Sequence, residues 1–437
     1  MASRGVIFPI GIMLALVAII LMFSGGTTPV NHVAAINGAD TAWMLTSSAL
    51  VLVMTPGLAF FYGGMVNKKN VISTMLQSFI CMVVITIVWV VVGFSLVFGD
   101  SVIGIYGNPS SYFMMKGVIE GAPWRMAPTI PFVLFAFYQL KFAIIAPALI
   151  TGAFAERIRF KSYIVFIVLF CLFIYCPIAH ATWHPEGILA RWGVLDFAGG
   201  TVVHMSAGWA ALASAIYLKS RNSQTHKPAR ITYVILGTGM LWFGWFGFNA
   251  GSAFGANNIA ATALATTMTA SAAAAFSWII FDAMRGRLPS AMGSCIGAVV
   301  GLVAITPAAG FISIPHALVV GIISSVISNL MVELRTRSKV DDTLDVFPCH
   351  GVGGIVGMLL TGVFASKNIN GAVVDNGLIF GHTKLFYIQT GAMVAVSVFC
   401  FLASFVLLKI TDLITPLRVT ESEERDGLDL SQHGESL

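Results

Sequence analysis

Long apolar runs separated by short polar loops make up most of this sequence. Eleven of these runs are close to the ~20 residues that a helix needs to cross the hydrocarbon core of a bilayer. Their predicted limits are 41–62, 72–98, 129–154, 162–182, 197–218, 231–251, 257–282, 289–306, 312–334, 347–365 and 387–410. The pattern therefore predicts an all-α polytopic membrane protein with eleven transmembrane helices, whose membrane domain covers residues 40–410.

The composition supports this class and excludes an ordinary soluble domain. Of the 437 residues, 57% are hydrophobic and only 10% are charged, whereas soluble domains carry about 25% charged residues. The mean hydropathy is +0.88. We attribute the net charge of +5 to loops beside the membrane, and therefore expect no nucleic-acid partner. The six cysteines lie in or beside apolar runs without a CxxC pair, so we interpret them as core thiols.

The placement of Lys and Arg predicts the orientation. If the first run starts outside the cell, most basic residues fall on the inner side, where such residues accumulate. The basic residues of the inner loops and tail are then Lys68, Lys69, Arg157, Arg159, Lys161, Lys219, Arg221, Lys227, Arg230, Arg285, Arg287, Arg335, Arg337, Lys339, Lys409, Arg418 and Arg425. We predict a protein of the cell (inner or plasma) membrane with its N-terminus outside and its C-terminus in the cytoplasm.

Residues 1–25 precede these helices. Arg4, a following apolar stretch and the small residues from Ser24 onward are typical of a cleaved secretory signal peptide. The apolar stretch is long, so an uncleaved membrane anchor stays open as the alternative.

Two histidines occupy matching places in the chain. His204 lies in the run 197–218 and His350 in the run 347–365, and glycines surround both. Each run is the fifth in a set of five, which predicts two inverted five-helix halves followed by a C-terminal helix. Inverted repeats place their binding site near the membrane midplane, between the halves.

The histidine pair allows three interpretations. Ionisable groups at membrane depth are costly and usually face a pathway, which favours handling of a proton or of a small hydrogen-bonding solute. The simpler alternative is two core histidines, each hydrogen-bonded across helices. A metal site is the third, but neither histidine has a further His, Asp, Glu or Cys at helical spacing. We therefore expect no metal and no cofactor.

Aromatic residues gather near the predicted outer ends of three runs. They occur in 137–142, at Trp183 and in 244–252. Aromatic faces attract compact cations by about 0.5–2 kcal/mol, and the Ser252 hydroxyl would add an acceptor. The alternative interpretation is an aromatic belt that anchors the helices at the membrane surface.

Several segments resemble one known family, the Amt/Mep/Rh ammonium transporters, on the bacterial and plant Amt side. The resemblance covers the chain from about residue 40 to residue 434. The segments are Thr55-Pro-Gly-Leu-Ala-Phe-Phe-Tyr-Gly-Gly64, Ala155-Glu-Arg-Ile-Arg-Phe160, Asp196-Phe-Ala-Gly-Gly-Thr-Val-Val-His204, Gly244-Trp-Phe-Gly-Phe-Asn-Ala-Gly-Ser252 and Asp345-Val-Phe-Pro-Cys-His-Gly-Val-Gly-Gly354.

The resemblance implies a homotrimer in which each subunit holds its own narrow hydrophobic pore. The transported species would be ammonium or ammonia, with methylammonium as an analogue. His204 and His350 match the twin histidines that line the pore of this family. Phe142 and Phe248 match its stacked phenylalanine gate.

Five further positions match the family's outer site. Trp183, Ser252 and Tyr138 match the residues that recruit ammonium. Asp196 matches the vestibule aspartate, and its place before a helix predicts capping rather than direct binding. Trp245 matches an aromatic residue beside the gate.

Three features depart from the family pattern. Tyr138 stands where the family also uses Phe, which adds a hydroxyl near the recruitment site. Lys141 is next to the gate residue Phe142, but one step along a helix turns a side chain by about 100°, so we expect it to face another helix or subunit. The stretch 183–187, Trp-His-Pro-Glu-Gly, is more polar than expected for this loop.

These observations predict an ammonium transporter or channel that binds the cation outside, removes a proton near the gate and conducts ammonia along the imidazoles. The main alternative is an ammonium sensor that signals through a docked cytoplasmic partner. A membrane enzyme is disfavoured, because the sequence shows no nucleophile motif, carboxylate pair or cofactor motif.

Residues 411–437 form the predicted cytoplasmic tail. Its acidic composition alone is typical of a disordered terminus, but Gly427-Leu-Asp and Ser431-Gln-His-Gly-Glu435 resemble the family's tail motif, which implies a regulatory tail docked on the cytoplasmic face and across to the neighbouring subunit. We expect Leu428 and Leu430 to be buried beneath it. The basic partners expected for it are Arg157, Arg159, Lys161, Arg335 and Arg337. Phosphorylation at Thr420 or Ser422, or a PII-type signalling protein, would move it.

Overall fold

The apolar runs fold as helices because a backbone inside hydrocarbon must satisfy its own hydrogen bonds. The computed structural model describes residues 13, 15–18, 20–22, 36–223 and 227–437. The predicted signal peptide at 1–25 falls mostly outside these residues. The longer helices are α2 (Gly38–Met65), α3 (Val71–Val88), α5 (Phe132–Phe154), α6 (Phe160–Phe170), α7 (Cys176–Trp183), α9 (Ser206–Leu218), α10 (Ile231–Ala250), α11 (Asn258–Met284), α12 (Ala291–Ile305), α13 (Ile314–Arg337), α14 (Gly353–Phe364) and α15 (Lys384–Ile414).

Short elements connect and interrupt these helices. Short α-helices are α4 (Phe94–Phe98), α8 (Ile188–Trp192), α16 (Glu421–Asp426) and α17 (Leu428–His433). Wider π-helical turns are η2 (Trp89–Gly93), η4 (Cys171–Tyr175), η5 (Gly200–Met205) and η7 (Phe347–Val352). Tight 3-10 turns are η1 (Lys68–Asn70), η3 (Phe113–Met115), η6 (Gly251–Ala253) and η8 (Leu378–Phe380). The all-α prediction is wrong in one detail, because β1 (Ser101–Val102) and β2 (Tyr106–Gly107) form a small antiparallel hairpin, with Ser101 opposite Gly107.

Ten helical stretches of the described residues are long and apolar enough to cross a membrane. The predicted run 289–306 is present as the apolar helix α12, but this helix has only 15 residues. At ~1.5 Å per residue it extends ~22 Å, which is short of the ~30 Å hydrocarbon core. The prediction of a polytopic helical membrane protein is confirmed, whereas the count of eleven transmembrane helices is not.

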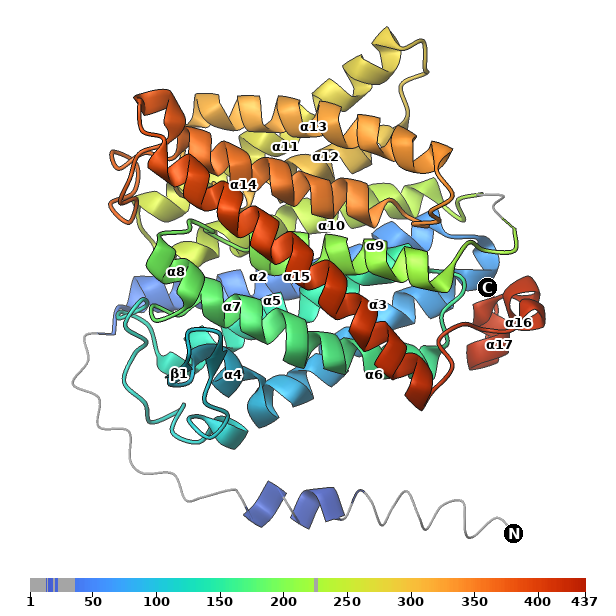
Figure 1. The fold of residues 1–437 in the computed structure, drawn as a ribbon, viewed down its shortest axis with the longest axis horizontal. Helices are drawn as coiled ribbons and strands as arrows, with labels where there is room; N and C mark the ends of the chain where they lie inside the picture. Colours follow the sequence, from blue (N-terminus) through green and yellow to red (C-terminus); the bar gives the residue numbers. More distant parts are fainter. Residues whose placement is uncertain (1–12, 14, 19, 23–35, 224–226) are drawn as a thin grey trace.

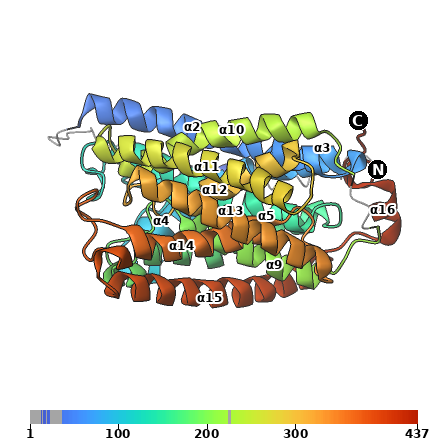
Figure 2. The same ribbon diagram turned by 90° about the horizontal axis from the view of Figure 1, so that it is seen from above.

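The helices lie side by side in one bundle (Figure 1). The tail helices α16 and α17 are at one end, and the β1 hairpin and α8 are at the other. Seen from above, α2 and α10 lie along one edge and α15 along the opposite edge, with α5, α9 and α12 between them (Figure 2). Nearly every side chain of α5 is buried, so this helix forms the centre of the bundle.

Two helical segments cross unusually closely at the centre. A Cβ atom on Gly208 of α9 would overlap the backbone nitrogen and Cα of Gly351 in η7. Only two glycines allow backbones to approach this closely, as in other membrane helix pairs with small residues at the contact. His204 lies one turn before Gly208 and His350 directly before Gly351, so this crossing brings the two histidines together.

A buried ion cluster holds the loops at the tail end of the bundle. Arg221 pairs with Glu156 at 2.9 Å and with Asp341 at 2.8 Å, and all three side chains are about 5% exposed. Burial alone would raise the pKa of both carboxyls, but the Arg221 charge and hydrogen bonds hold the pKa of Glu156 and of Asp341 below the usual values. The cluster joins the loops that follow α5, α9 and α13.

The glycine crossing gives a first prediction. Gly208→Ala is expected to lower the thermal stability of the detergent-solubilised protein and to disturb the histidine pair, because the new methyl group overlaps the Gly351 backbone. Gly239→Ala in α10 is the matched control, since a Cβ there meets no atom within 4 Å. Equal melting temperatures for the two variants would contradict the close crossing.

The ion cluster gives a second prediction. Arg221→Gln leaves two buried carboxylates unpaired, which costs about 3–5 kcal/mol at neutral pH. In the wild type, the lowered carboxyl pKa values supply stability above pH ~4, near the unfolded values, that is lost as the pH falls. In Arg221→Gln, a falling pH protonates the two unpaired carboxylates and so removes the cost of burying their charge. The difference in melting temperature between the two proteins is therefore expected to shrink from pH 7 to pH 4.5.

The exposed Lys219 in the same loop provides the control, since Lys219→Gln should show no such pH dependence. A constant difference between wild type and Arg221→Gln across this pH range would show that the carboxylates are not held by Arg221.

Candidate functional site

A cavity of about 330 Å³ has in its lining Ala190 of α8. The helix α8 lies at the end of the bundle opposite the tail helices (Figure 1). We call this cavity the vestibule. Most of its lining is aromatic, which suits a compact cation better than an anion. The lining residues are Phe98, Trp124, Met126, Phe135, Gln139, Phe142, Thr182, Trp183, Pro185, Ala190, Phe197, Ser252 and Phe254. Sequence reasoning identified Phe142, Trp183 and Ser252 among them and missed the rest.

Two stacked phenylalanines close the floor of the vestibule. The rings of Phe142 and Phe248 lie 4.3 Å apart at 31°, and both side chains are almost completely buried. The Trp183 ring meets Phe142 edge-on at 5.7 Å. The Trp183 indole donates a hydrogen bond to the Asp196 carbonyl at 3.1 Å, which fixes it at the wall. Of the two phenylalanines, Phe142 lines the vestibule and Phe248 lies behind it.

The two histidines follow directly behind Phe248. The His204 ring lies 6.0 Å from Phe248 and 5.4 Å from His350. The Nδ1 atoms of the two imidazoles are 3.3 Å apart, so one carries a proton and the other accepts it. The buried Nε2 of His204 has no hydrogen-bond partner among the described residues. Beyond His350 lies a small cavity whose lining includes Tyr62, Val299 and Asp345.

Two aspartates hold the histidine-bearing turns. Asp196 accepts hydrogen bonds from the backbone nitrogens of Gly199, Gly200 and Thr201 at 2.6–2.8 Å, at the start of η5. Asp342 accepts in the same way from the first residues of η7, from Val346 at 3.1 Å and Phe347 at 2.7 Å. The role of Asp342 was missed, because the sequence drew attention to Asp345 instead.

Asp345 forms an ion pair instead of a cap. It pairs with Arg335 at 2.7 Å, although burial raises the pKa of its carboxyl to about 7. The π-helical turns that carry His204 and His350 are thus anchored at their starts by the carboxylates of Asp196 and Asp342, and Asp345 has another role.

Tyr138 and Trp245 lie beside the pathway but do not line the vestibule. The Tyr138 hydroxyl donates to the carbonyls of Gly247 and Phe248, each at 3.0 Å, and lies 3.3 Å from the Ser252 hydroxyl. The Trp245 ring stacks on His204 at 5.3 Å, and its indole donates to Thr306 at 2.9 Å. Both residues support others that face the pathway.

The structure also shows the surroundings of Lys141 and of the polar stretch 183–187. The Lys141 ammonium lies 6.0 Å from the Phe137 ring, and neither residue lines the vestibule. His184 stacks on His180 at 4.4 Å, and its Nδ1 accepts a hydrogen bond from the Glu186 backbone at 3.1 Å. The polar stretch 183–187 is thus a turn stabilised by histidines. Among the described residues, no group of three or more His, Cys, Asp or Glu is placed to hold a metal ion.

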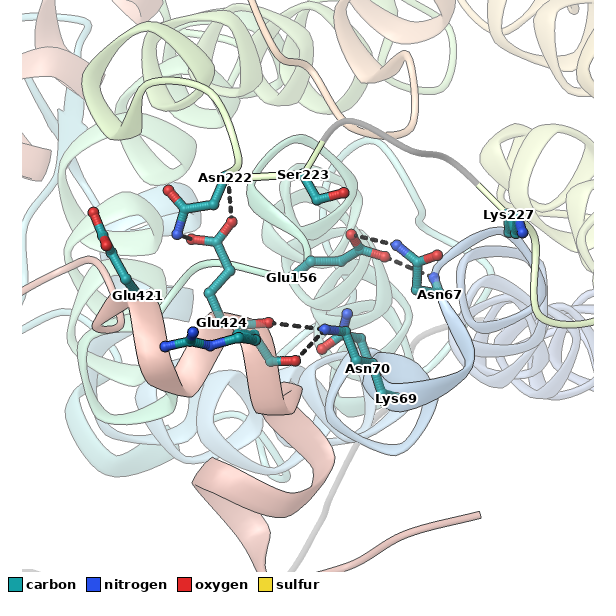
Figure 3. Close-up of a pocket in the computed structure, with 10 residues that line it drawn as sticks. Asn67, Lys69, Asn70, Glu156, Asn222, Ser223, Lys227, Glu421 and Glu424 are labelled. Carbon is teal, nitrogen blue, oxygen red and sulfur yellow. Dashed lines mark hydrogen bonds between the residues drawn. The ribbon is translucent and has the colours of Figure 1, made fainter.

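The tail docks on the other end of the bundle. Asp429 accepts from the backbone nitrogens of Ile72 and Ser73, at 3.1 and 2.8 Å, and so caps α3. The Glu424 carboxylate accepts a hydrogen bond from the Asn222 backbone nitrogen at 2.6 Å. The Lys69 ammonium donates to the backbone carbonyls of Glu424 and Arg425 (Figure 3).

These groups border a cavity of about 600 Å³ that lies between the tail and the loops after α2 and α9. Its walls carry both signs of charge. The residues that line it are Asn67, Lys69, Asn70, Glu156, Asn222, Ser223, Lys227, Glu421, Glu424 and Arg425.

Several expected tail contacts differ in the structure. Arg159 does pair with the tail, with Glu423 at 2.9 Å. Arg335 and Arg337 pair instead with Asp345 and Glu333, so their predicted role as tail partners is wrong. Arg157 is fully buried and meets the tail only through its carbonyl, which accepts from the Val419 nitrogen. Leu428 is buried, but Leu430 is 59% exposed, so its predicted burial is also wrong.

Comparison with known proteins identifies the family. A family model described as the Ammonium Transporter Family matches residues 42–437. The chain belongs to this family. Curated relatives named as ammonium transporters include a putative one from Methanothermobacter thermautotrophicus, 43% identical over 403 residues, which cover 92% of this chain and 98% of the relative. Another is from Bacillus subtilis, 44% identical over 400 residues, which cover 91% of this chain and 97% of the relative.

Solved structures of ammonium transporter family members share the fold. Saccharomyces cerevisiae Mep2 matches with a TM-score of 0.84 and 34% identity, over 91% of this chain and 90% of Mep2. A structure titled Sensor Amt Protein matches with a TM-score of 0.81 and 28% identity, over 90% of this chain and 98% of that one. Named members of the family are transporters, which points to a multi-pass membrane transporter of ammonium and not to an enzyme.

Proposed function

We propose that this ammonium transporter family member recruits ammonium in the vestibule, deprotonates it at the phenylalanine gate and conducts ammonia along His204 and His350. The observation that carries the proposal is the unbroken row of aromatic rings from the vestibule to the histidines. Trp183, Phe142, Phe248, His204 and His350 follow one another with ring centroids 4.3–6.0 Å apart.

The apolar gate favours the neutral species. The idealised cost of moving a small ion from water into a medium of low dielectric constant is of order 20 kcal/mol. Phe142 and Phe248 offer a cation only their π-faces, which compensate about 2 kcal/mol of this cost. Ammonia carries no charge and avoids the penalty, so loss of a proton at the gate gives the easier passage. The same argument disfavours potassium, which has no proton to lose.

The imidazole pair suits ammonia once it has passed the gate. Because the two Nδ1 atoms share one proton, one Nε2 is a donor and the other is an acceptor. Ammonia can likewise donate through its N–H groups and accept through its lone pair. The vestibule supplies the complementary first step, because Ser252 donates its own proton to the Phe248 carbonyl at 2.9 Å and keeps its lone pairs for a cation.

The architecture proposed with this function follows the sequence analysis. Eleven helices cross the membrane, α12 among them, in two inverted five-helix halves followed by α15, and three copies form a trimer. The packing of α2 on α10, the first helices of the two halves, supports the inverted arrangement. The basic residues of the loops support an orientation with the tail in the cytoplasm and the vestibule outside.

The docked tail supports a regulatory role. Thr420 caps α16 through a reciprocal pair of bonds with Glu423, so a phosphate on Thr420 would add negative charge beside Glu421 and Glu423 and break this cap. The adjacent Ser422 hydroxyl lies 3.1 Å from that of Thr420. A PII-type signalling protein would reach the mixed-charge cavity of Figure 3 from the cytoplasm.

One observation favours a second candidate function. The similarity to the Sensor Amt Protein, together with a tail docked on several loops, is compatible with an ammonium sensor that reports occupancy to a docked partner. Flux separates the two functions, because a pure sensor binds ammonium and transports none.

The histidine pair provides the main test. Replacing His204 and His350 together by Ala or Asp is expected to reduce ammonia flux in proteoliposomes by at least about tenfold, equivalent to ~1.4 kcal/mol, or to admit potassium current. The reason is that the groups which exchange hydrogen bonds with ammonia are lost. His382→Ala, at an exposed histidine outside the pathway, is the control. Wild-type flux and selectivity in the double variant would show that the pathway lies elsewhere.

The tail gives a separate test. Asp429→Ala removes the carboxylate that caps α3, so trypsin is expected to cut at the exposed Arg425 at least about fivefold faster, as the loss of ~1 kcal/mol of docking energy implies. If the docked tail regulates transport, ammonium flux changes in the same variant at equal surface expression. Glu435→Ala, at an exposed tail position away from the Arg425 cleavage site, should change neither quantity. Faster cleavage with unchanged flux would assign the tail a structural role only.

A further inference from the structure

Two buried polar side chains in the vestibule lack hydrogen-bond partners. Gln139 on α5 and Thr182 on α7 both line the cavity and are only 5% and 6% exposed. Neither the Gln139 Oε1 atom nor the Thr182 hydroxyl has a partner within the part of the chain that the structure describes. A buried polar group without a partner costs about 1–3 kcal/mol, and most such groups in proteins are paired.

Several side chains of the same types are satisfied elsewhere among the described residues. The Gln389 amide accepts from the Leu195 nitrogen at 2.9 Å and donates to the Leu195 carbonyl at 2.8 Å. Thr86 and Thr238 donate to the carbonyls four residues earlier in their helices, at 2.6 and 2.7 Å. Threonine hydroxyls in helices commonly make this bond. Thr182 does not, although its helical position allows it.

The two groups stand at the place where a cation would wait before the gate. Gln139 precedes the gate residue Phe142 by one helical turn, and Thr182 is next to Trp183. Ser252 lines the same cavity from the end of α10. A half-turn of the Gln139 amide exchanges its oxygen and nitrogen at nearly the same positions, so the carbonyl oxygen can face the cavity.

We propose that the Gln139 carbonyl and the Thr182 hydroxyl accept hydrogen bonds from ammonium bound in the vestibule, and so complete a polar half of the recruitment site. The proposal rests on the proposed function and names two further residues that select its substrate. Ammonium has four N–H donors. The oxygens of Gln139, Thr182 and Ser252 would accept hydrogen bonds from three of them. The fourth N–H would point at the aromatic faces.

The same arrangement distinguishes ammonium from methylammonium. Methylammonium has one N–H fewer. When one oxygen acceptor is replaced by an apolar group, methylammonium can turn its methyl group toward that group and its freed N–H toward the aromatic faces, whereas ammonium is left with one N–H that has no acceptor. The two residues should raise the preference for ammonium over its methylated analogue.

The experiment measures half-saturation concentrations for ammonium and methylammonium currents in proteoliposomes that contain the full chain. Gln139→Leu and Thr182→Val are each expected to raise the value for ammonium by about three- to tenfold, the loss of one hydrogen bond to a cation. The value for methylammonium should rise less. Thr182→Val has nearly the shape of the native side chain, so it tests the proposal even if Gln139→Leu folds poorly.

Two controls separate binding from structure. Thr182→Ser keeps the hydroxyl and should retain wild-type half-saturation. Gln77→Leu removes another buried amide whose Oε1 lacks a partner but which does not line the vestibule, and it should change neither value. An equal loss for both cations in Gln139→Leu and Thr182→Val would mean that the residues support the fold, and would overturn the proposal.

Trp183→Leu distinguishes failure of this proposal from failure of the proposed function. If Trp183→Leu weakens ammonium half-saturation while Gln139→Leu and Thr182→Val match the wild type, the polar half of the site is wrong and aromatic recruitment stands. If all three variants match the wild type, recruitment in the vestibule is wrong altogether.

Discussion

The close crossing of α9 and η7 at Gly208 and Gly351 is the contact on which the histidine pair depends. It places two backbones where a single methyl group would separate them, and the imidazoles meet because each stands within one turn of that contact. Asp196 and Asp342 then fix the turns from their starting ends. The geometry of the pair is therefore set by backbone contacts and caps, and the Nε2 atom of His204 has no hydrogen-bond partner among the described residues.

The proposed mechanism meets the cost of removing a cation from water in successive steps. In the vestibule, aromatic faces and oxygen acceptors would replace part of the hydration of the cation. Phe142 and Phe248 offer only aromatic carbon, so the proposed loss of the proton would occur there. Behind the two phenylalanines, the imidazole pair offers hydrogen-bond donors and acceptors that suit a neutral molecule. This order of polar and apolar groups supports the proposal.

Hydropathy was sufficient to predict the helical bundle, because this signal is local in the sequence. The matching positions of His204 and His350 drew attention to two imidazoles that lie 3.3 Å apart in the structure. The remaining features depend on tertiary contacts. The helix α12 has 15 residues and packs among α10, α11, α13 and α14. Tyr138 turns away from the vestibule because its hydroxyl finds two carbonyls of α10. The pairing of Arg221 with Glu156 and Asp341 joins loops far apart in the chain, and no periodicity reveals it.

The docked tail and the pathway are connected through consecutive residues of two loops. Glu424 of the tail accepts a hydrogen bond from the Asn222 backbone, and the neighbouring Arg221 forms an ion pair with Asp341. The residue after Asp341, Asp342, caps the start of η7, which carries His350. Each of these contacts is buried or partly buried, so salt screens them less than an exposed ion pair. The tail and η7 are therefore linked by one series of hydrogen bonds and ion pairs, which supports the proposal that the tail regulates conduction.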